Sequence, residues 1–181
     1  MTKFVALLRG INVSGQKQIK MSDLKSLFED LNFIKVQTYI QSGNVIFEYN
    51  INDIISLGGK IEKKIKEKFG FDVKIILKTC AELGFILINN PFVKKQKTNP
   101  DSVYVTFLSE EPSSINIKKL NEVNYNPEEY FIDSKTIYVF LPNGYGRAKL
   151  NNNFFESKLK VQTTTRNWKT VNKLVELSKS N

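Results

Sequence analysis

Apolar residues along the chain follow two repeating spacings, and these divide its first half into strands and helices. Short apolar runs of strand length alternate with segments whose apolar positions recur every three or four residues, which is the spacing of one helix face. The predicted elements are strands at 4–9, 36–41, 45–49 and 71–78 and helices at 22–31 and 54–69. Their order, βαββαβ, is that of the ferredoxin-like unit. Ser22 is the predicted cap of the first helix, and the glycine pair at 58–59 predicts a frayed or broken start for the second.

The second half of the chain partly repeats this pattern. Its predicted elements are helices at 79–88, 114–122 and 150–159, strands at 103–108, 130–133 and 136–141, and a last helix capped by Thr165. A basic linker bounded by Pro91 and Pro100 precedes the βαββαα part. We therefore predict an α+β protein with a ferredoxin-like subdomain at 1–90 and a second α+β subdomain at 91–181 packed on the first.

Composition is that of a globular protein, and with no predicted secretory signal we expect it in the cytoplasm. Of the 181 residues, 41% are apolar and 25% are charged, and no apolar run approaches the roughly 20 residues of a membrane span. The apolar run that starts at Phe4 is too short for a secretory signal. A single cysteine, Cys80, excludes an internal disulfide and a multi-cysteine metal cluster.

The chain contains no histidine, which narrows the chemistry available to it. Serine–histidine triads, cysteine–histidine pairs and histidine-ligated zinc are excluded. Acid–base chemistry would use carboxylates, lysine, tyrosine or the thiol. We predict neither a cofactor nor a metal.

Basic residues exceed acidic ones by nine, and almost all of them are lysine. Such a charge suits nucleic acid or an anionic metabolite as partner, although a lysine excess also arises from an AT-rich genome. Only three arginines occur among the 27 basic residues, namely Arg9, Arg147 and Arg166. Their retention favours sites that need the planar guanidinium fork.

The antiparallel strand order of a ferredoxin-like sheet, 4-1-3-2, predicts one candidate site. It brings the end of the first strand, with Arg9 and Asn12, beside the turn that holds Ser42 and Asn44. Glycines in both segments allow close approach of the backbone, and the four side chains are suited to a phosphate or carboxylate. The alternative is that the turn residues only shape the turn and Arg9 pairs with a local carboxylate.

Two further segments carry candidate anion-binding groups. The glycine-bearing stretch with Tyr145, Arg147 and Lys149 leads into a helix, and Arg166 and Asn167 open the last helix. Helix N-termini favour anions because their first N–H groups lack internal partners. We predict that the last helix shares a cleft with the Arg9 loop. The alternative is that Arg166 pairs with a carboxylate such as Asp133 or Glu156.

These segments resemble the signature stretches of the bacterial family called "domain of unknown function 1697". The matching stretches are LLRGINV at 7–13, TYIQSGN at 38–44, NPF at 90–92, Tyr145-Gly146 with Lys149-Leu150, and TTRNW at 164–168. Ser14 departs from the glycine that is more frequent in the family. The resemblance implies an α+β architecture with ferredoxin-like parts and implies no activity.

Three functions are compatible with these features. The first is a binding protein for an anionic ligand, either a phosphorylated metabolite or nucleic acid. The second is an enzyme that uses the same cleft, with Lys149, Tyr145 or a carboxylate as proton carrier. The third is a homo-oligomeric or protein-partner module. Steep salt dependence favours nucleic acid, and an isolated pocket with convergent polar groups favours a small molecule.

Overall fold

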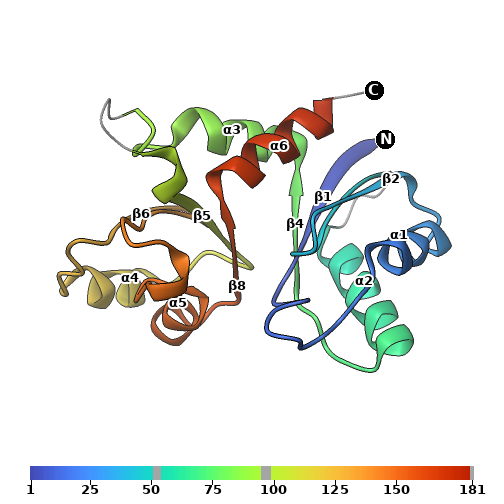
Figure 1. Ribbon diagram of the computed structural model, residues 1–181, viewed down its shortest axis with the longest axis horizontal. Coiled ribbons are helices and arrows are strands. Elements are labelled where there is room, and N and C mark those ends of the chain that lie inside the picture. The colour runs from blue at the N-terminus through green and yellow to red at the C-terminus, as the bar shows by residue number, and fades with distance from the viewer. Residues whose placement is uncertain (51–53, 95–98, 180–181) are drawn as a thin grey trace. The chain divides into compact units, whose positions relative to one another are not determined.

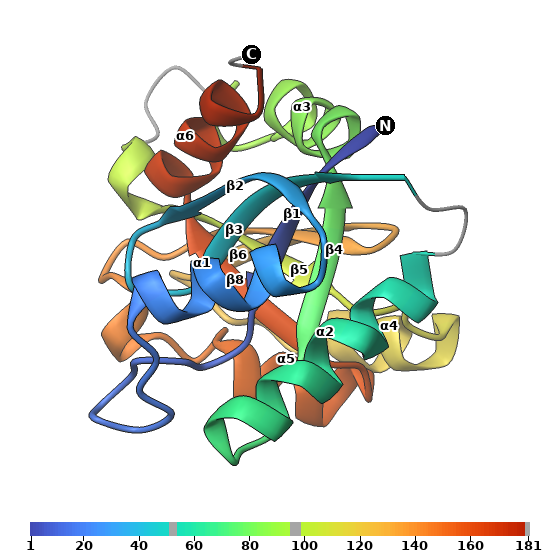
Figure 2. The ribbon, with the colours of Figure 1, turned by 90° about the vertical axis from the view of Figure 1, so that its right-hand side faces the viewer.

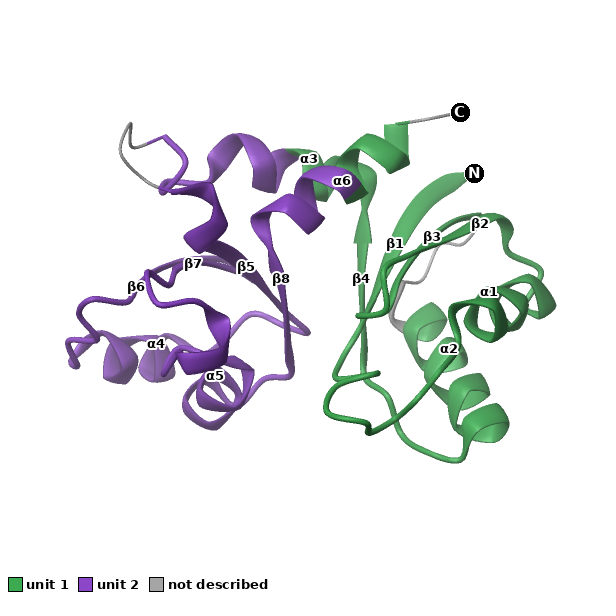
Figure 3. Cartoon of the chain, in the orientation of Figure 1, with its two compact units in different colours: residues 1–84, 174–181 green, residues 85–173 purple. Residues whose placement is uncertain are grey.

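The computed structural model describes residues 1–50, 54–94 and 99–179, so part of the predicted linker, residues 95–98, lies outside the described residues. The chain divides into two compact units, one of residues 1–84 with 174–181 and one of residues 85–173 (Figure 3). Each unit holds one four-stranded antiparallel sheet, which confirms the α+β class in two halves. No helix in the described ranges has the length and hydropathy of a membrane span.

The first unit has the predicted βαββαβ order. Its elements are β1 (Thr2–Leu8), α1 (Met21–Asp30), β2 (Ile34–Tyr39), β3 (Asn44–Tyr49), α2 (Ile54–Phe69) and β4 (Ile75–Thr79). The strand order β2-β3-β1-β4 is the predicted 4-1-3-2 arrangement read from the other edge. Helix α2 continues through Gly58 and Gly59, so the predicted break is wrong.

Helices α1 and α2 cover one face of this sheet (Figure 2). The alternating side chains of β1, Phe4, Ala6 and Leu8, point to these helices and are buried with Leu24 and Leu27 of α1. Burying each large apolar side chain stabilises the unit by roughly 1.5–3 kcal/mol. This packing fixes where β1 ends and α1 begins, and the loop between them carries the site described below.

The second unit is built on the same plan (Figure 1). Its elements are β5 (Val103–Leu108), α4 (Ser114–Asn121), β6 (Glu129–Asp133), β7 (Thr136–Phe140), α5 (Asn152–Leu159) and β8 (Thr163–Asn167). The strand order is β6-β7-β5-β8, with α4 and α5 on one face. Two helices, α3 (Cys80–Asn89) and α6 (Trp168–Lys179), contribute residues to both units. Short 3-10 turns lie at Pro100–Ser102 and Tyr145–Arg147.

Strand β8 is the main difference from the sequence prediction. We expected Thr165 to cap the last helix, but Thr165 lies within β8 and pairs with Thr106 of β5. The cap of α6 is formed by Asn167, whose Oδ1 accepts a hydrogen bond of 2.8 Å from the Thr170 N–H. Consecutive threonines have no apolar alternation, yet their β-branched side chains favour extended backbone. The second unit is therefore βαββαβ and not βαββαα.

The start of α1 also differs from the prediction. The helix begins at Met21, its N-cap residue is Lys20, and no side chain accepts a hydrogen bond from the first turn. Ser22 donates instead to the carboxylate of Asp23, so the predicted Ser22 cap is wrong. The first N–H groups of α1 thus lack the side-chain acceptor that serine, threonine or aspartate normally supplies.

Candidate functional site

A hollow of about 390 Å³ lies in the first unit, at the end of the sheet where the β1–α1 loop meets the turn between β2 and β3. It is lined by Asn12, Gly15, Gln18, Ile19, Lys20, Met21 and Gln41. We call it the Lys20 hollow. Its volume is in the range of small-molecule sites in proteins, roughly 300–1,000 Å³. All of its walls come from one unit, so the hollow is a property of that unit alone.

Asn12 joins the two walls of the Lys20 hollow. Its Nδ2 donates to the carbonyl oxygens of Ile19, at 3.0 Å, and Gln41, at 2.9 Å. Its Oδ1 accepts from the Ile19 N–H at 2.8 Å. Asn12 has a φ of 55°, in the left-handed region that asparagine tolerates better than most residues. Its amide is therefore committed to the loop, and Asn12 positions the site.

The β2–β3 turn is closed by Asn44, which is fully buried. Its Nδ2 donates to the Tyr39 carbonyl at 2.9 Å and to the Ser42 hydroxyl at 3.2 Å. The Leu8 N–H donates to the Gly43 carbonyl at 2.9 Å, which ties the turn to the end of β1. The predicted proximity of Asn12 to this turn is therefore confirmed.

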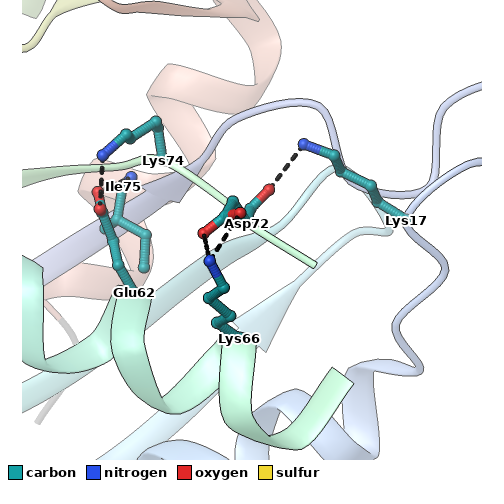
Figure 4. A network of polar contacts seen from close by, with 6 residues as sticks. All are labelled: Lys17, Glu62, Lys66, Asp72, Lys74 and Ile75. Atoms are coloured by element: carbon teal, nitrogen blue, oxygen red, sulfur yellow. Dashed lines mark hydrogen bonds and ion pairs between the residues drawn. The ribbon is translucent and has the colours of Figure 1, made fainter. Parts of the chain in front are cut away.

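The outer side of the loop is held by a polar network that includes the end of α2 (Figure 4). Lys17 Nζ donates to the backbone carbonyl of Asp72 at 2.7 Å, and Lys66 lies 3.0 Å from the Asp72 carboxylate. The Arg9 N–H donates to the Lys74 carbonyl at 2.8 Å. These contacts hold the loop against the segment that precedes β4. Other residues of the same loop line the hollow.

Lys20 is electrostatically unusual among the lysines of the first unit. Most of the others lie within 4.0 Å of a carboxylate oxygen, namely Lys3, Lys25, Lys35, Lys63, Lys64, Lys66, Lys68, Lys74 and Lys78. The Lys20 side chain is exposed and makes no hydrogen bond or ion pair with any described residue. Lys20 thus lines the hollow, and its positive charge has no counter-ion among the described residues.

Helix α1 adds a smaller positive field at the same place. Its N-terminus begins at the wall residues Lys20 and Met21 and has no side-chain cap. A helix N-terminus carries the equivalent of about +0.5 charge. Asp23 lies in the first turn and offsets part of this field, but its exposed side chain does not line the hollow.

The predicted anion-binding segment of the second unit is occupied by a carboxylate of the chain itself. Glu128 accepts hydrogen bonds from the N–H groups of Lys149, at 2.9 Å, and Leu150, at 2.8 Å. The Tyr145 hydroxyl accepts from the Asn152 N–H at 3.1 Å. The side chains of Arg147 and Lys149 are exposed. Two backbone N–H groups of the segment thus already bind an anionic group of the chain, Glu128, and ligand binding by Tyr145, Arg147 and Lys149 stays a prediction.

Arg166 and Asn167 lie at the end of β8. Arg166 is 6% exposed, and its Nη1 donates to the Thr164 hydroxyl at 2.8 Å and to the Thr165 carbonyl at 2.9 Å. Asn167 is engaged as the cap of α6. Arg9 and Arg166 belong to different units, and the cleft predicted to be shared between them stays a prediction.

A family model for "Protein of unknown function (DUF1697)" matches residues 1–138. The chain belongs to this family. A solved structure of a conserved bacterial protein, SP0830 from Streptococcus pneumoniae, has the same fold, with a TM-score of 0.74 and 21% sequence identity. The likeness covers 98% of this chain and 99% of that protein. No curated protein matches the chain.

The DUF1697 match contains every residue that lines the Lys20 hollow, whereas Tyr145, Arg147, Lys149, Arg166 and Asn167 lie beyond its end. Sequence reasoning identified Asn12 but missed Gln18, Lys20 and Gln41. One local signal was present for Lys20, because a lysine stands where a helix usually begins with serine, threonine, asparagine or aspartate. Nothing local distinguishes the two glutamines from solvent-exposed glutamines elsewhere.

Proposed function

We propose that this DUF1697 protein binds a small phosphorylated metabolite in the Lys20 hollow. The observation that supports the proposal is that Lys20, whose ammonium has no partner among the described residues, lines a hollow together with the amide residues Asn12, Gln18 and Gln41. No carboxylate is among the seven lining residues. An anion in the hollow would supply the counter-ion that the described residues do not.

The charge around the hollow favours a phosphate ester over a carboxylate. Lys20 contributes one positive charge, and the N-terminus of α1 contributes about half a charge. A phosphate monoester carries about −1.5 to −2 at neutral pH, and a carboxylate carries −1. The cytoplasm, the compartment expected from the sequence, is consistent with a phosphorylated metabolite as ligand.

Nucleic acid, the other anion considered, has less support. Proteins that bind single strands without sequence preference combine basic grooves with aromatic side chains on which bases stack. No aromatic residue lines the hollow, and most lysines of the first unit already neutralise carboxylates. The enzyme alternative has less support, because neither Tyr145, Lys149 nor any carboxylate residue is among those that line the hollow.

Replacing Lys20 tests the proposal. We expect Lys20→Met to weaken binding of inorganic phosphate and of glycerol phosphate at least tenfold, because the only unpaired lysine of the wall is lost. Isothermal titration calorimetry measures this affinity. The melting temperature should change little, since the Lys20 side chain makes no hydrogen bond or ion pair with a described residue.

Lys25→Met is the matched control. Lys25 lies on the same helix, and its ammonium is 3.7 Å from Glu29, so its removal should leave phosphate affinity unchanged. Equal affinities of wild type and Lys20→Met, or the absence of phosphate binding by the wild type, would refute the proposed function.

A further inference from the structure

We propose that the ligand carries hydroxyl groups next to its phosphate, and that Gln18 and Gln41 recognise these hydroxyls. The inference rests on the proposed function and narrows the ligand to a polyhydroxylated phosphate ester of the sugar-phosphate type. It derives from the chemistry of the lining residues other than Lys20.

Gln18 and Gln41 line the hollow from its two walls, the β1–α1 loop and the β2–β3 turn. Neither side-chain amide makes a hydrogen bond with a described residue. The backbone carbonyl of Gln41 is held by Asn12 at 2.9 Å, which keeps the backbone of this wall in place. The hollow therefore presents two amides, on two tethered walls, with hydrogen-bonding capacity left over.

A glutamine amide offers both donors and an acceptor, whereas an ionised anion requires only donors. Each glutamine offers two N–H donors and one carbonyl oxygen with two lone pairs. Phosphate oxygens use the donors only, and the carbonyl oxygens need a donor on the ligand, which a hydroxyl group supplies. A hydroxyl also accepts, so one polyol can satisfy both halves of both amides.

The remaining wall residues favour a ligand that has a carbon skeleton and no nucleobase. Ile19 and Met21 offer apolar surface for C–H groups, and methionine adapts to irregular shapes. The absence of aromatic residues from the lining leaves no platform for stacking a nucleobase. A sugar phosphate therefore matches the hollow better than a nucleotide does.

Calorimetric titration with inorganic phosphate, phenyl phosphate and glucose 6-phosphate tests the inference. The wild type should bind glucose 6-phosphate at least tenfold more tightly than either other probe, because only this ligand carries several carbon-bound hydroxyl groups that can donate to both amide oxygens. Gln18→Met and Gln41→Met preserve side-chain length and remove the amide. Each should lower the ratio of glucose 6-phosphate affinity to inorganic phosphate affinity severalfold, whereas substitution of a glutamine outside the hollow should not.

Gln16→Met is the control, because Gln16 is exposed in the same loop and does not line the hollow. If inorganic phosphate binds through Lys20 but glucose 6-phosphate binds no more tightly, the hydroxyl inference is wrong and the proposed function stands. If neither phosphate nor glucose 6-phosphate binds the wild type, the proposed function is wrong and the inference falls with it. A preference that survives both glutamine substitutions also overturns the inference.

Discussion

Single residues with unusual backbone conformations shape the walls of the Lys20 hollow. Left-handed φ values occur at Gly10, Asn12, Gly15, Ile40 and Gly43, all in or beside the two segments that line it. Ile40 has a φ of 49° and is 45% exposed. A β-branched residue in this region is strained, and exposure brings no burial energy in return. Conformations of this kind are held by the surrounding contacts, here those of Asn12 and Asn44.

Among these positions, Gly43 is the one where we expect a substitution to destabilise the protein most. Its φ is 77°, and a Cβ atom at this position would lie 2.6 Å from Ile11 Cδ1 and 2.8 Å from Leu8 Cβ. We expect Gly43→Ala to lower the free energy of unfolding by about 2–3 kcal/mol, from backbone strain and overpacking together. Urea denaturation measures the change.

Gly15→Ala separates the two causes. Gly15 has a similar φ of 75°, and no atom lies within 4 Å of its added Cβ. We expect a loss of about 1 kcal/mol from strain alone. Equal losses for the two variants would contradict the close packing of Gly43 against β1.

At the scale of secondary-structure elements, helix ends decide where polar groups are available. Helix α1 has no side-chain cap, whereas α3 begins with a reciprocal pair. Glu82 accepts from the Thr79 N–H at 2.7 Å and from its hydroxyl at 2.9 Å, and the Thr79 oxygen accepts from the Glu82 N–H at 3.2 Å. Such a capping box satisfies two N–H groups that would otherwise lack partners.

The capping box of α3 makes stability depend on pH. Burial by itself would raise the pKa of the Glu82 carboxyl, but hydrogen bonds from Thr79 and the charge of Lys78 lower this pKa below 4.5. A lowered pKa in the folded state stabilises the protein above the unfolded value, and this contribution is lost as pH falls through the folded value. Glu82 is 47% exposed, so solvent screens its ion pair with Lys78, and the hydrogen bonds carry most of the effect.

Glu82→Ala should therefore cost about 1 kcal/mol of unfolding free energy at pH 7 and less at pH 3. Urea denaturation of wild type and variant at both pH values measures the difference. Glu29→Ala, which removes an exposed partner of Lys25, is the control and should change the unfolding free energy little at both pH values. A cost that grows on acidification would contradict the capping role.

At the scale of the whole molecule, the net charge of +9 is divided between the units. The first unit has fourteen basic and ten acidic residues, and the second has thirteen and eight. In the first unit most lysines also lie beside carboxylates, as at Lys35, Lys66 and Lys74. Affinity for nucleic acid grows with the number of phosphates that a protein neutralises. Much of the positive charge of the first unit is thus neutralised by neighbouring carboxylates and is less available to phosphates.

We therefore expect short single-stranded DNA and RNA oligonucleotides to bind weakly at 0.15 M salt, with dissociation constants of about 10⁻⁴ M or above. Fluorescence anisotropy of labelled oligonucleotides across a salt series measures this. Micromolar affinity with a steep dependence on salt would instead favour nucleic acid over a small metabolite.

The class of fold and the order of most elements follow from the sequence alone. Apolar spacing marks helices and strands locally, and the order βαββαβ then placed the β1 loop beside the β2–β3 turn, as at Asn12 and Gln41. The same local signals failed at β8, because a run of threonines shows no alternation of apolar and polar side chains. They also failed at α1, where Ser22 was predicted as the cap and Lys20 is the N-cap residue.

Only the tertiary structure decided which polar groups remain available. Glu128 reaches the N–H groups of Lys149 and Leu150 from more than twenty residues away and fills the glycine-bearing segment that the sequence offered as a ligand site. Lys20 looks like many other lysines in the sequence, yet the folded chain pairs its neighbours and leaves it among the residues that line a hollow. Periodicity is a local property, whereas pairing depends on which distant residues folding brings within hydrogen-bonding distance.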